Sequence, residues 1–458
     1  MKASFVNLLR RSVPVCLALP GLAAAQGADV VAGEITGPFK WGSLNGFSAY
    51  SIGTSSCNIG DVDLLWDDEL NDGTPANLHP VMGQNIFRYK DGRFEQLGQS
   101  WLKHAFFALN FNGLCGNDCQ PAANGSLLGP GCWDPYSASL NGEQRGMGPK
   151  FEVNASTGFH PWPYTGDGTQ GNDLFKRIQI RNSDLDPSQN AGARYFGEGQ
   201  YVTPDDAAAG NDDNNATYRE ISVGGFNNGY NLNFTGPNRI GQPAIFAWKE
   251  VDSDVELVVV DVPQDGRFWV AYRVTDNGDG TWRYEYAIQN LNSDRAADGF
   301  ELPSDSSVAV SGLGFKGVGY HSGEPFDNDN WTSSAGSSSI SWGSPQPFGR
   351  NPDTNALRWG TMYNFWFTAD AAPEMGEATL SLFKPGPAAE DRSVMVLVPG
   401  TNDVCRADTN GDGLVTPQDF GTWVQAYNSQ APACDQNGDG LCTPSDFSSW
   451  VQNYNAGC

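Results

Sequence analysis

Two stretches near the C-terminal end place side-chain oxygens at the spacing of a calcium-binding loop. Calcium takes about six to eight oxygen ligands, and a loop of about twelve residues supplies them from positions 1, 3, 5, 7 and 12. The ligands predicted for the first loop are Asp408, Asn410, Asp412, the main-chain carbonyl of Leu414, and Asp419. Those predicted for the second loop are Asp435, Asn437, Asp439, the carbonyl of Leu441, and Asp446. The sequence therefore predicts that two Ca²⁺ ions bind in tandem.

The same short helical pattern follows each predicted loop. The apolar residues behind the first loop are Phe420, Trp423, Val424 and Tyr427, and their counterparts behind the second are Phe447, Trp450, Val451 and Tyr454. They fall at i, i+3, i+4 and i+7, which is the apolar stripe of an amphipathic helix. The pattern predicts a duplicated, paired loop–helix module, small and α-helical, over residues 404–458.

This module resembles a type I dockerin, in which Asp rather than Glu closes each loop and no helix precedes it. The ending Tyr454-Asn-Ala-Gly-Cys458 resembles the Gly-Cys-terminated dockerins of secreted planctomycete proteins. The resemblance implies a calcium-folded module that docks onto a cohesin-like or cell-surface protein. Cellulosomal dockerins usually carry Ser or Thr at loop positions 10 and 11, whereas this chain has Pro417-Gln418 and Pro444-Ser445. The resemblance therefore leaves the identity of the partner open.

The cysteines fall in two groups of four, apart from Cys16 near the start of the chain. The front group is Cys57, Cys115, Cys119 and Cys132, and the late group is Cys405, Cys434, Cys442 and Cys458. Even numbers in an exported chain favour disulfides over a zinc site at the front group. Four cysteines permit three pairings. A pseudo-twofold module that brings its ends together would pair Cys405 with Cys458 and leave Cys434 with Cys442.

Residues 1–25 have the character of a signal peptide. A basic start precedes a short apolar stretch, and Ala23-Ala24-Ala25 supplies the small residues that cleavage requires. The apolar stretch is too short to span a bilayer, and no later segment approaches the necessary length. Removing three basic residues changes the formal charge from −26 to −29. We expect a secreted, extracellular or cell-surface protein without a membrane span, and such an acidic surface makes nucleic acid an unsuitable partner.

The region between the signal peptide and the repeat is predicted to be mainly β. We expect an N-terminal β- and loop-rich region at 26–240, a β-sandwich region at 241–395 and a linker at 396–403. Alternating or consecutive apolar residues predict strands at 256–261, 267–275, 282–288, 307–315, 338–342, 358–367 and 378–382. Trp101–Phe111 is apolar enough to be a buried strand. The fold class is therefore a large β-sandwich-like region followed by the small helical module.

Three segments of the second region resemble a β-rich module of secreted planctomycete proteins. They are Tyr284–Arg295, Tyr320–Pro325 and Asn355–Phe365. We know of no activity that this module implies, so the resemblance supports only the sandwich fold and the type of organism.

No catalytic constellation stands out in the sequence. The four histidines, His79, His104, His160 and His321, form no pair at metal-ligand spacing, so packed or surface roles are expected for them. No G-x-S-x-G elbow occurs. The most suggestive acidic group is Asp67, Asp68 and Glu69 beside Trp66, because an indole raises the pKa of a neighbouring carboxyl. The segment 205–215 is rich in oxygen donors and could hold a further calcium ion or be a solvated loop.

Dockerins mostly accompany carbohydrate-active or carbohydrate-binding modules. We therefore expect the protein to bind polysaccharide or to take part in its breakdown, with O-glycosyl hydrolase or lyase activity as the enzymatic form. The alternative is a non-catalytic cell-envelope or adhesion protein. A groove with two carboxylates about 5–10 Å apart under aromatic walls would favour the enzyme.

Overall fold

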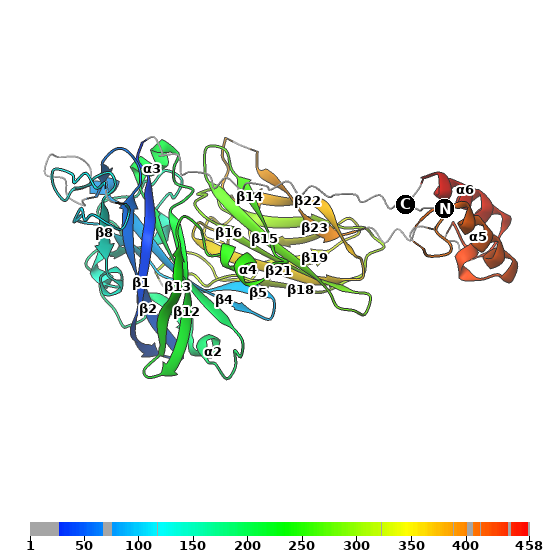
Figure 1. Cartoon of the computed structure of the whole chain (residues 1–458), viewed down its shortest axis with the longest axis horizontal. Coiled ribbons are helices and arrows are strands. Elements are labelled where there is room, and N and C mark those ends of the chain that lie inside the picture. The colour runs from blue at the N-terminus through cyan, green and yellow to red at the C-terminus, as the bar shows by residue number, and fades with distance from the viewer. Residues whose placement is uncertain are drawn as a thin grey trace, which may run out of the picture.

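The computed structural model describes residues 27–66, 76–116, 118–321, 323–387, 389–400, 406–412, 414–437 and 441–456. The protein is mainly β, as predicted, with several sheets (Figure 1). The predicted signal peptide lies outside the described residues, as do Asp67, Asp68 and Glu69.

The front of the chain forms two sheets. The strands of the four-stranded sheet are β1 (Val30–Leu44), β2 (Phe47–Asn58), β10 (Ile178–Arg181) and β8 (Trp133–Tyr136). The strands of the seven-stranded sheet, in order, are β13 (Tyr230–Arg239), β12 (Ala216–Phe226), β11 (Arg194–Val202), β4 (Val81–Lys90), β6 (Leu102–His104) and β9 (Met147–Gly148), with β5 (Arg93–Gln99) paired to β4. A two-stranded sheet joins β3 (Leu64–Leu65) to β7 (Leu127–Leu128).

Two five-stranded sheets follow. The first has the order β14 (Glu256–Asp261), β15 (Arg267–Asp276), β16 (Trp282–Asn290), β21 (Thr361–Ala369) and β18 (Val310–Lys316). The second has the order β19 (Thr332–Ala335), β20 (Ser339–Gly343), β17 (Ala297–Pro303), β22 (Pro373–Leu382) and β23 (Asp391–Pro399). The strand pairs described here are antiparallel, as expected for strands joined by short turns.

The helices are short, apart from the last two. The short ones are η1 (Ala76–Leu78), α1 (Ala138–Asn141), η2 (Gln144–Gly146), η3 (Lys150–Glu152), α2 (Asn182–Leu185), α3 (Pro204–Ala209), α4 (Phe246–Val251) and η4 (Pro432–Cys434). The longer pair is α5 (Pro417–Ser429) and α6 (Pro444–Ala456). In the described ranges, no helix combines the length and the apolar character that crossing a bilayer requires.

The four large sheets are stacked through three hydrophobic cores. Successive residues of one strand point to opposite faces, so Ile86 of β4 joins the core against the four-stranded sheet while Phe87 joins the core against the β14–β18 sheet. In the same way, Ala287 of β16 faces the seven-stranded sheet and Tyr286 faces the core shared with the β19–β23 sheet. The two central sheets are therefore buried on both faces, and β4 and β5 lie at the junction (Figure 1).

A buried carboxylate connects the two central sheets. Glu198 of β11 is fully buried. One of its oxygens accepts a hydrogen bond from Asn85 Nδ2 (2.8 Å), and the other accepts from the Ala244 amide (2.6 Å) and from Gln289 Nε2 of β16 (2.8 Å). Burial raises the pKa of Glu198, and these hydrogen bonds oppose the rise. The junction is thus a polar network within an apolar interface.

Ion pairs extend this junction around β5. Arg93 of β5 binds Glu285 of β16 through two hydrogen bonds of 2.8 Å, and its guanidinium lies 3.5 Å from the ring centre of Trp366. Glu95 of the same strand pairs with Arg88 and, at 2.5 Å, with Lys316 at the end of β18. Ion pairs therefore join strand β5 of the seven-stranded sheet to β16 and to the end of β18 in the neighbouring sheet.

Most strand predictions in the second region are confirmed. The predicted strand at 256–261 is β14, and the alternating runs on either side of the turn at 276–280 are β15 and β16. The sequence pattern did not predict β17, which contains a glycine, β19, which is short, or β23, which follows a turn-rich stretch.

The prediction of a buried strand at Trp101–Phe111 is wrong. Only Leu102–His104 form a strand, β6, and the large apolar side chains that follow are exposed: Phe106, Phe107, Leu109 and Phe111 are each 40% exposed or more. The segment has no hydrogen-bonding partner strand beyond His104, apart from a single bridge at Phe111. Apolar content alone therefore did not indicate burial here.

We predict that Glu198→Ala destabilises the stacked sheets strongly. The change leaves three buried donors without an acceptor, and each costs about 1–3 kcal/mol, so the free energy of unfolding should fall by at least about 3 kcal/mol. Urea unfolding followed by tryptophan fluorescence measures it. The control is Glu301→Ala on an exposed position of β17, which should change stability by no more than about 0.5 kcal/mol. Equal effects of the two variants would contradict the role of Glu198.

Candidate functional site

The residues predicted to close the two calcium loops occupy equivalent places before the two long helices. Asp419 Oδ2 accepts hydrogen bonds from the amide (2.8 Å) and the hydroxyl (3.1 Å) of Thr416. Asp446 Oδ2 accepts from the amide (2.7 Å) and the hydroxyl (3.0 Å) of Thr443. Both carboxylates are buried, and each ties its loop to the start of its helix. The repeat in the sequence is thus a repeat in local structure.

In the first loop, backbone amides donate hydrogen bonds to side-chain oxygens of the same loop. Asp408 Oδ1 accepts from the amides of Gly411 (2.8 Å) and Asp412 (3.1 Å), and Asn410 Oδ1 accepts from the Asp412 amide (2.9 Å). Asp419 Oδ1 also accepts from the Asn410 amide at 3.2 Å. The side chains at positions 1, 3 and 12 are therefore gathered on one concave turn.

The second loop is described at its two ends. Asp446 Oδ1 accepts from the amides of Gln436 (2.9 Å) and Asn437 (3.3 Å), which matches the contact between Asp419 and Asn410. Asp435, Asn437 and Leu441 lie in the described residues, whereas Asp439 lies outside them, as do Gly413 and Gly440.

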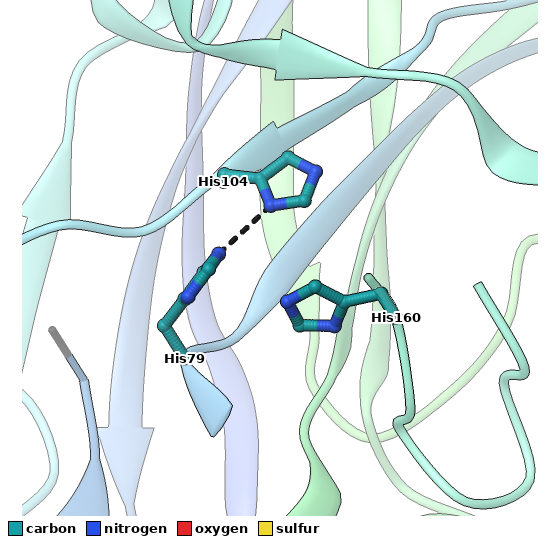
Figure 2. A group of neighbouring side chains, drawn as sticks. All are labelled: His79, His104 and His160. Atoms are coloured by element: carbon teal, nitrogen blue, oxygen red, sulfur yellow. Dashed lines mark hydrogen bonds between the residues drawn. The ribbon is translucent and has the colours of Figure 1, made fainter. Parts of the chain in front are cut away.

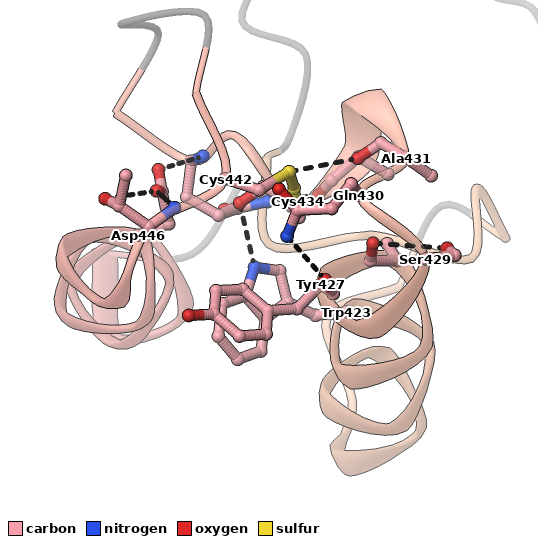
Figure 3. Close-up of a disulfide and its surroundings, with 12 residues drawn as sticks. Trp423, Tyr427, Ser429, Gln430, Ala431, Cys434, Cys442 and Asp446 are labelled. Atoms are coloured by element: carbon pink, nitrogen blue, oxygen red, sulfur yellow. Dashed lines mark hydrogen bonds between the residues drawn. A yellow bond between two sulfur atoms is a disulfide. The ribbon is translucent and has the colours of Figure 1, made fainter.

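Aromatic side chains hold the two helices together. Trp423 of α5 and Trp450 of α6 are buried, with ring centres 6.4 Å apart, and Phe447 packs 5.6 Å from Trp423. Trp423 Nε1 donates to the Cys434 carbonyl at 3.1 Å, beside the disulfide that joins Cys434 to Cys442 (Figure 3). The predicted helices and this disulfide are confirmed, while Cys405 and Cys458 lie outside the described residues.

The front cysteines also form disulfides. Cys57 pairs with Cys115, and Cys119 pairs with Cys132. Both bridges stabilise the loop-rich segment between β2 and β8. Disulfide sulfurs are not thiolates, so these four cysteines offer no zinc site.

A polar groove of about 640 Å³ opens where the front sheets meet the β14–β18 sheet. One wall comes from β5 and β10, with Gln99, Gln179 and Arg181. The other comes from the chain leaving β18, the segment Lys316–His321. The described residues that line the groove are Phe47, Gln96, Leu97, Gly98, Gln99, Gln179, Arg181, Asp184, Lys316, Gly317, Val318, Gly319, Tyr320, His321 and Asn328. The exposed side chains of Arg181 and Asn328 give it hydrogen-bonding capacity toward a hydroxyl-rich ligand.

Trp66 lies beside a carboxyl with a raised pKa, that of Asp134, although burial and not the indole raises it. Trp66 is fully buried and donates from Nε1 to Asp134 Oδ2 at 3.0 Å, and the Leu109 amide donates to Oδ1 at 2.8 Å. Burial raises the pKa of Asp134 to about 7, against the opposing effect of these two bonds. With both oxygens engaged inside the core, Asp134 has a structural role.

Acidic side chains of the oxygen-rich segment 205–215 accept hydrogen bonds from other groups of the protein. Asp205 accepts from the Leu65 amide (2.9 Å), Asp206 accepts from Asn215 (2.6 Å), and Asp212 accepts from Asn292 (2.6 Å). Desolvation raises the pKa of Asp206, and the nearby Asp29 and Asp212 raise it further. These acids connect α3 to neighbouring strands, and the solvated-loop alternative does not describe them.

The expectation that the histidines are packed or surface residues is confirmed for three of them, which are buried, but the sequence did not predict that these three lie together. His79, His104 and His160 are buried together, and one nitrogen from each lies within 4.8 Å of the others (Figure 2). His321 lies elsewhere, with Nε2 at 3.0 Å from the Arg177 carbonyl. The separations of the first three in the sequence match no local metal-binding motif, so the sequence carried no signal for this cluster.

Comparison with known proteins identifies no family for this chain. No protein-family model matches it, and no curated protein matches it in sequence. Among solved structures, the crystal structure of the exo-chitosanase CsxA of Amycolatopsis orientalis aligns with a TM-score of 0.15 and 9% sequence identity, over 77% of this chain and 25% of that one. The chain thus spans about a quarter of the length of that enzyme. At this TM-score the likeness carries no argument about fold or function.

We predict that Asp134 makes the protein less stable as the pH rises from about 4 to about 7. The pKa is 3.8 without the fold and about 7 within it, so between these values only the folded state binds the proton. The stability difference between the wild type and Asp134→Asn should therefore decrease with rising pH, by up to about 1.4 kcal/mol for each pH unit. Urea unfolding at several pH values, with Ca²⁺ present, measures it.

The control for this series is Asp63→Asn, at an exposed position near the same loop. Its stability difference from the wild type should stay constant across the range. A constant difference for Asp134→Asn as well would show that Asp134 does not hold its proton in the fold.

Proposed function

We propose that this is a secreted calcium-binding protein that docks through its C-terminal loop–helix repeat and binds polysaccharide through its β-sheet body. The observation that carries the proposal is the pair of loops closed by Asp419 and Asp446. Each loop offers the oxygen ligands that calcium prefers, and each is tied to its helix by the same hydrogen bonds. We assign one Ca²⁺ ion to each loop, and the module to the dockerin type.

Exposed apolar side chains support the docking role. Leu414 and Leu441 are 64% and 63% exposed, and Phe420 and Phe447 are 38% and 45% exposed. Each pair occupies equivalent positions of the two repeats, so the module presents two similar apolar surfaces. Exposed apolar groups on a small module are typical of a protein–protein contact. We propose a cohesin-like or cell-surface protein as the partner.

The groove at the sheet junction supports polysaccharide binding. The exposed side chains of Asn328 and Arg181 can form hydrogen bonds with hydroxyl groups, and Phe47 offers an apolar face to a sugar ring. Arg181 lies 4.8 Å from the ring centre of Phe47, which orients both groups at the groove.

The alternative function is a non-catalytic cell-envelope or adhesion protein, and one observation favours it over hydrolysis. The described lining of the groove contains a single carboxylate, Asp184, and that carboxylate pairs with Arg88 at 3.3 Å. Glycoside hydrolysis uses a pair of carboxyl groups about 5–10 Å apart. We therefore propose binding at this groove, without cleavage.

Calcium titration of the full-length protein tests the docking module. We expect two bound Ca²⁺ ions in the wild type and one each in Asp412→Ala and Asp439→Ala, because each variant removes an anionic ligand from one loop. Isothermal titration calorimetry after removal of bound calcium measures the stoichiometry. Asp305→Ala, in a loop of the body, is the control and should retain both ions. Unchanged stoichiometry in both loop variants would disprove the ligand assignment.

Polysaccharide binding is tested with Arg181→Ala, which should weaken binding about 5–30-fold. The reason is that the side chain can provide one or two hydrogen bonds of about 1 kcal/mol each. Affinity electrophoresis of the full-length protein through gels containing plant or algal polysaccharides measures retardation, while reducing-end and unsaturated-product assays monitor cleavage. The control is Arg350→Ala, exposed and outside the groove lining.

The proposal is supported if at least one polymer retards the wild type and this retardation is reduced in Arg181→Ala but not in Arg350→Ala. Product formation would instead identify an enzyme. Absence of both retardation and products, with the calcium stoichiometry intact, would leave a docking protein whose body does not bind polysaccharide.

A further inference from the structure

Strand pairing brings the first two histidines of the cluster together. His79 lies two residues before β4, and His104 is the last residue of β6. These strands are antiparallel, with Val81 opposite His104, and the Ala105 amide donates to the Pro80 carbonyl at 3.0 Å. The two rings consequently face each other, with His79 Nε2 at 2.8 Å from His104 Nδ1. Both side chains are at most 3% exposed.

The third histidine comes from the loop that follows η3. The Asn154 amide donates to the Phe159 carbonyl at 2.9 Å, which closes this loop and fixes the position of His160. His160 Nδ1 lies 3.1 Å from the Gly158 carbonyl and must donate to it, so the proton is on Nδ1 and the lone pair is on Nε2. His160 Nε2 is buried and has no hydrogen-bond partner. Figure 2 shows this nitrogen turned toward His79 and His104.

The three rings present the features that a metal site requires. A histidine ligand usually donates its second N–H to a carbonyl or carboxylate, as His160 does to Gly158. Ligand nitrogens about 2.0–2.1 Å from a zinc ion in tetrahedral geometry are separated by about 3.4 Å. The corresponding nitrogens here lie within 4.8 Å of one another, so small rotations of the rings suffice.

Aromatic side chains enclose the cluster. Tyr164 stacks on His104 with ring centres 3.7 Å apart, and Trp162 meets His79 edge-on at 5.1 Å. The three imidazoles are therefore shielded from solvent.

We propose that His79, His104 and His160 bind one divalent transition-metal ion of the type that imidazole prefers, represented by zinc. Imidazole nitrogen suits Zn²⁺, Cu²⁺ and Ni²⁺, whereas Ca²⁺ prefers oxygen, so this site is chemically distinct from the two C-terminal loops. The ion connects three separate segments of the chain: the start of β4, the end of β6 and the loop at 154–160. Its role is to fix that loop against the paired ends of β4 and β6 in the seven-stranded sheet.

Zinc titration of the full-length protein tests this site. Ca²⁺ is kept present throughout so that the C-terminal loops remain occupied, and bound transition metal is first removed with a nitrogen chelator that spares calcium. We expect one Zn²⁺ ion per chain by calorimetry and by elemental analysis after gel filtration. In His160→Gln the affinity for Zn²⁺ should fall by at least about tenfold, because the substitution removes a nitrogen that binds the metal directly. His321→Gln, which changes the histidine outside the cluster, should bind as the wild type does.

Co²⁺ provides a second measurement that does not depend on a variant. Visible absorption of the cobalt-loaded wild type should show the ligand-field bands of nitrogen coordination, and zinc should displace them. Limited proteolysis should cut within 154–160 more rapidly in the metal-free protein. Parallel titrations with Cu²⁺ and Ni²⁺ identify the preferred metal. If either ion binds more tightly than Zn²⁺, the three histidines remain the assigned ligands and only the identity of the ion changes.

Two results would overturn the proposal. One is the absence of saturable binding of any of these metals to the wild type, which would make the cluster a packed group of neutral rings. The other is equal binding by His160→Gln and the wild type, with unchanged circular dichroism, which would place the metal elsewhere. Because calcium stoichiometry is measured separately, neither result bears on the C-terminal loops.

Discussion

Burial of Glu198 between two sheets is the constraint on which the rest of the body depends. A carboxylate removed from water must have its hydrogen bonds satisfied, and here Asn85, Ala244 and Gln289 supply them from three separate segments. A shift of one residue in β4, β11 or β16 would turn the side chain of Asn85, Glu198 or Gln289 to the opposite face. The network therefore fixes the register of the two central sheets, each of which is hydrophobic on both faces.

The fixed junction positions both candidate sites of the body. The groove has one wall on β5 and β10 and the other on the segment after β18, so its shape requires that the front sheets and the β14–β18 sheet keep one relative position. Arg93 and Glu95 of β5 provide that attachment through Glu285 and Lys316. The histidine cluster lies where β4 begins, two residues after His79, and β4 pairs with β5.

The two kinds of proposed metal site differ in how the fold assembles them. Each predicted calcium loop draws its oxygens from one short segment, and the helix that follows needs only to close it through Asp419 or Asp446. The proposed transition-metal site draws single nitrogens from three segments that pairing and a loop bring together. Hard oxygen and borderline nitrogen donors select different ions, so both sites can be occupied in the same molecule.

Features encoded within a few neighbouring residues could be predicted from the sequence. Alternating side chains identified β15 and β16, the repeat identified α5 and α6, and the pseudo-twofold symmetry of that repeat suggested the disulfide between Cys434 and Cys442. Apolar content without a partner strand gave the wrong prediction at Trp101–Phe111. The groove, the Glu198 network and the three-histidine cluster arise only from tertiary structure. His79 and His104 meet across 25 residues because two strands pair, and no local pattern encodes which strands will do so.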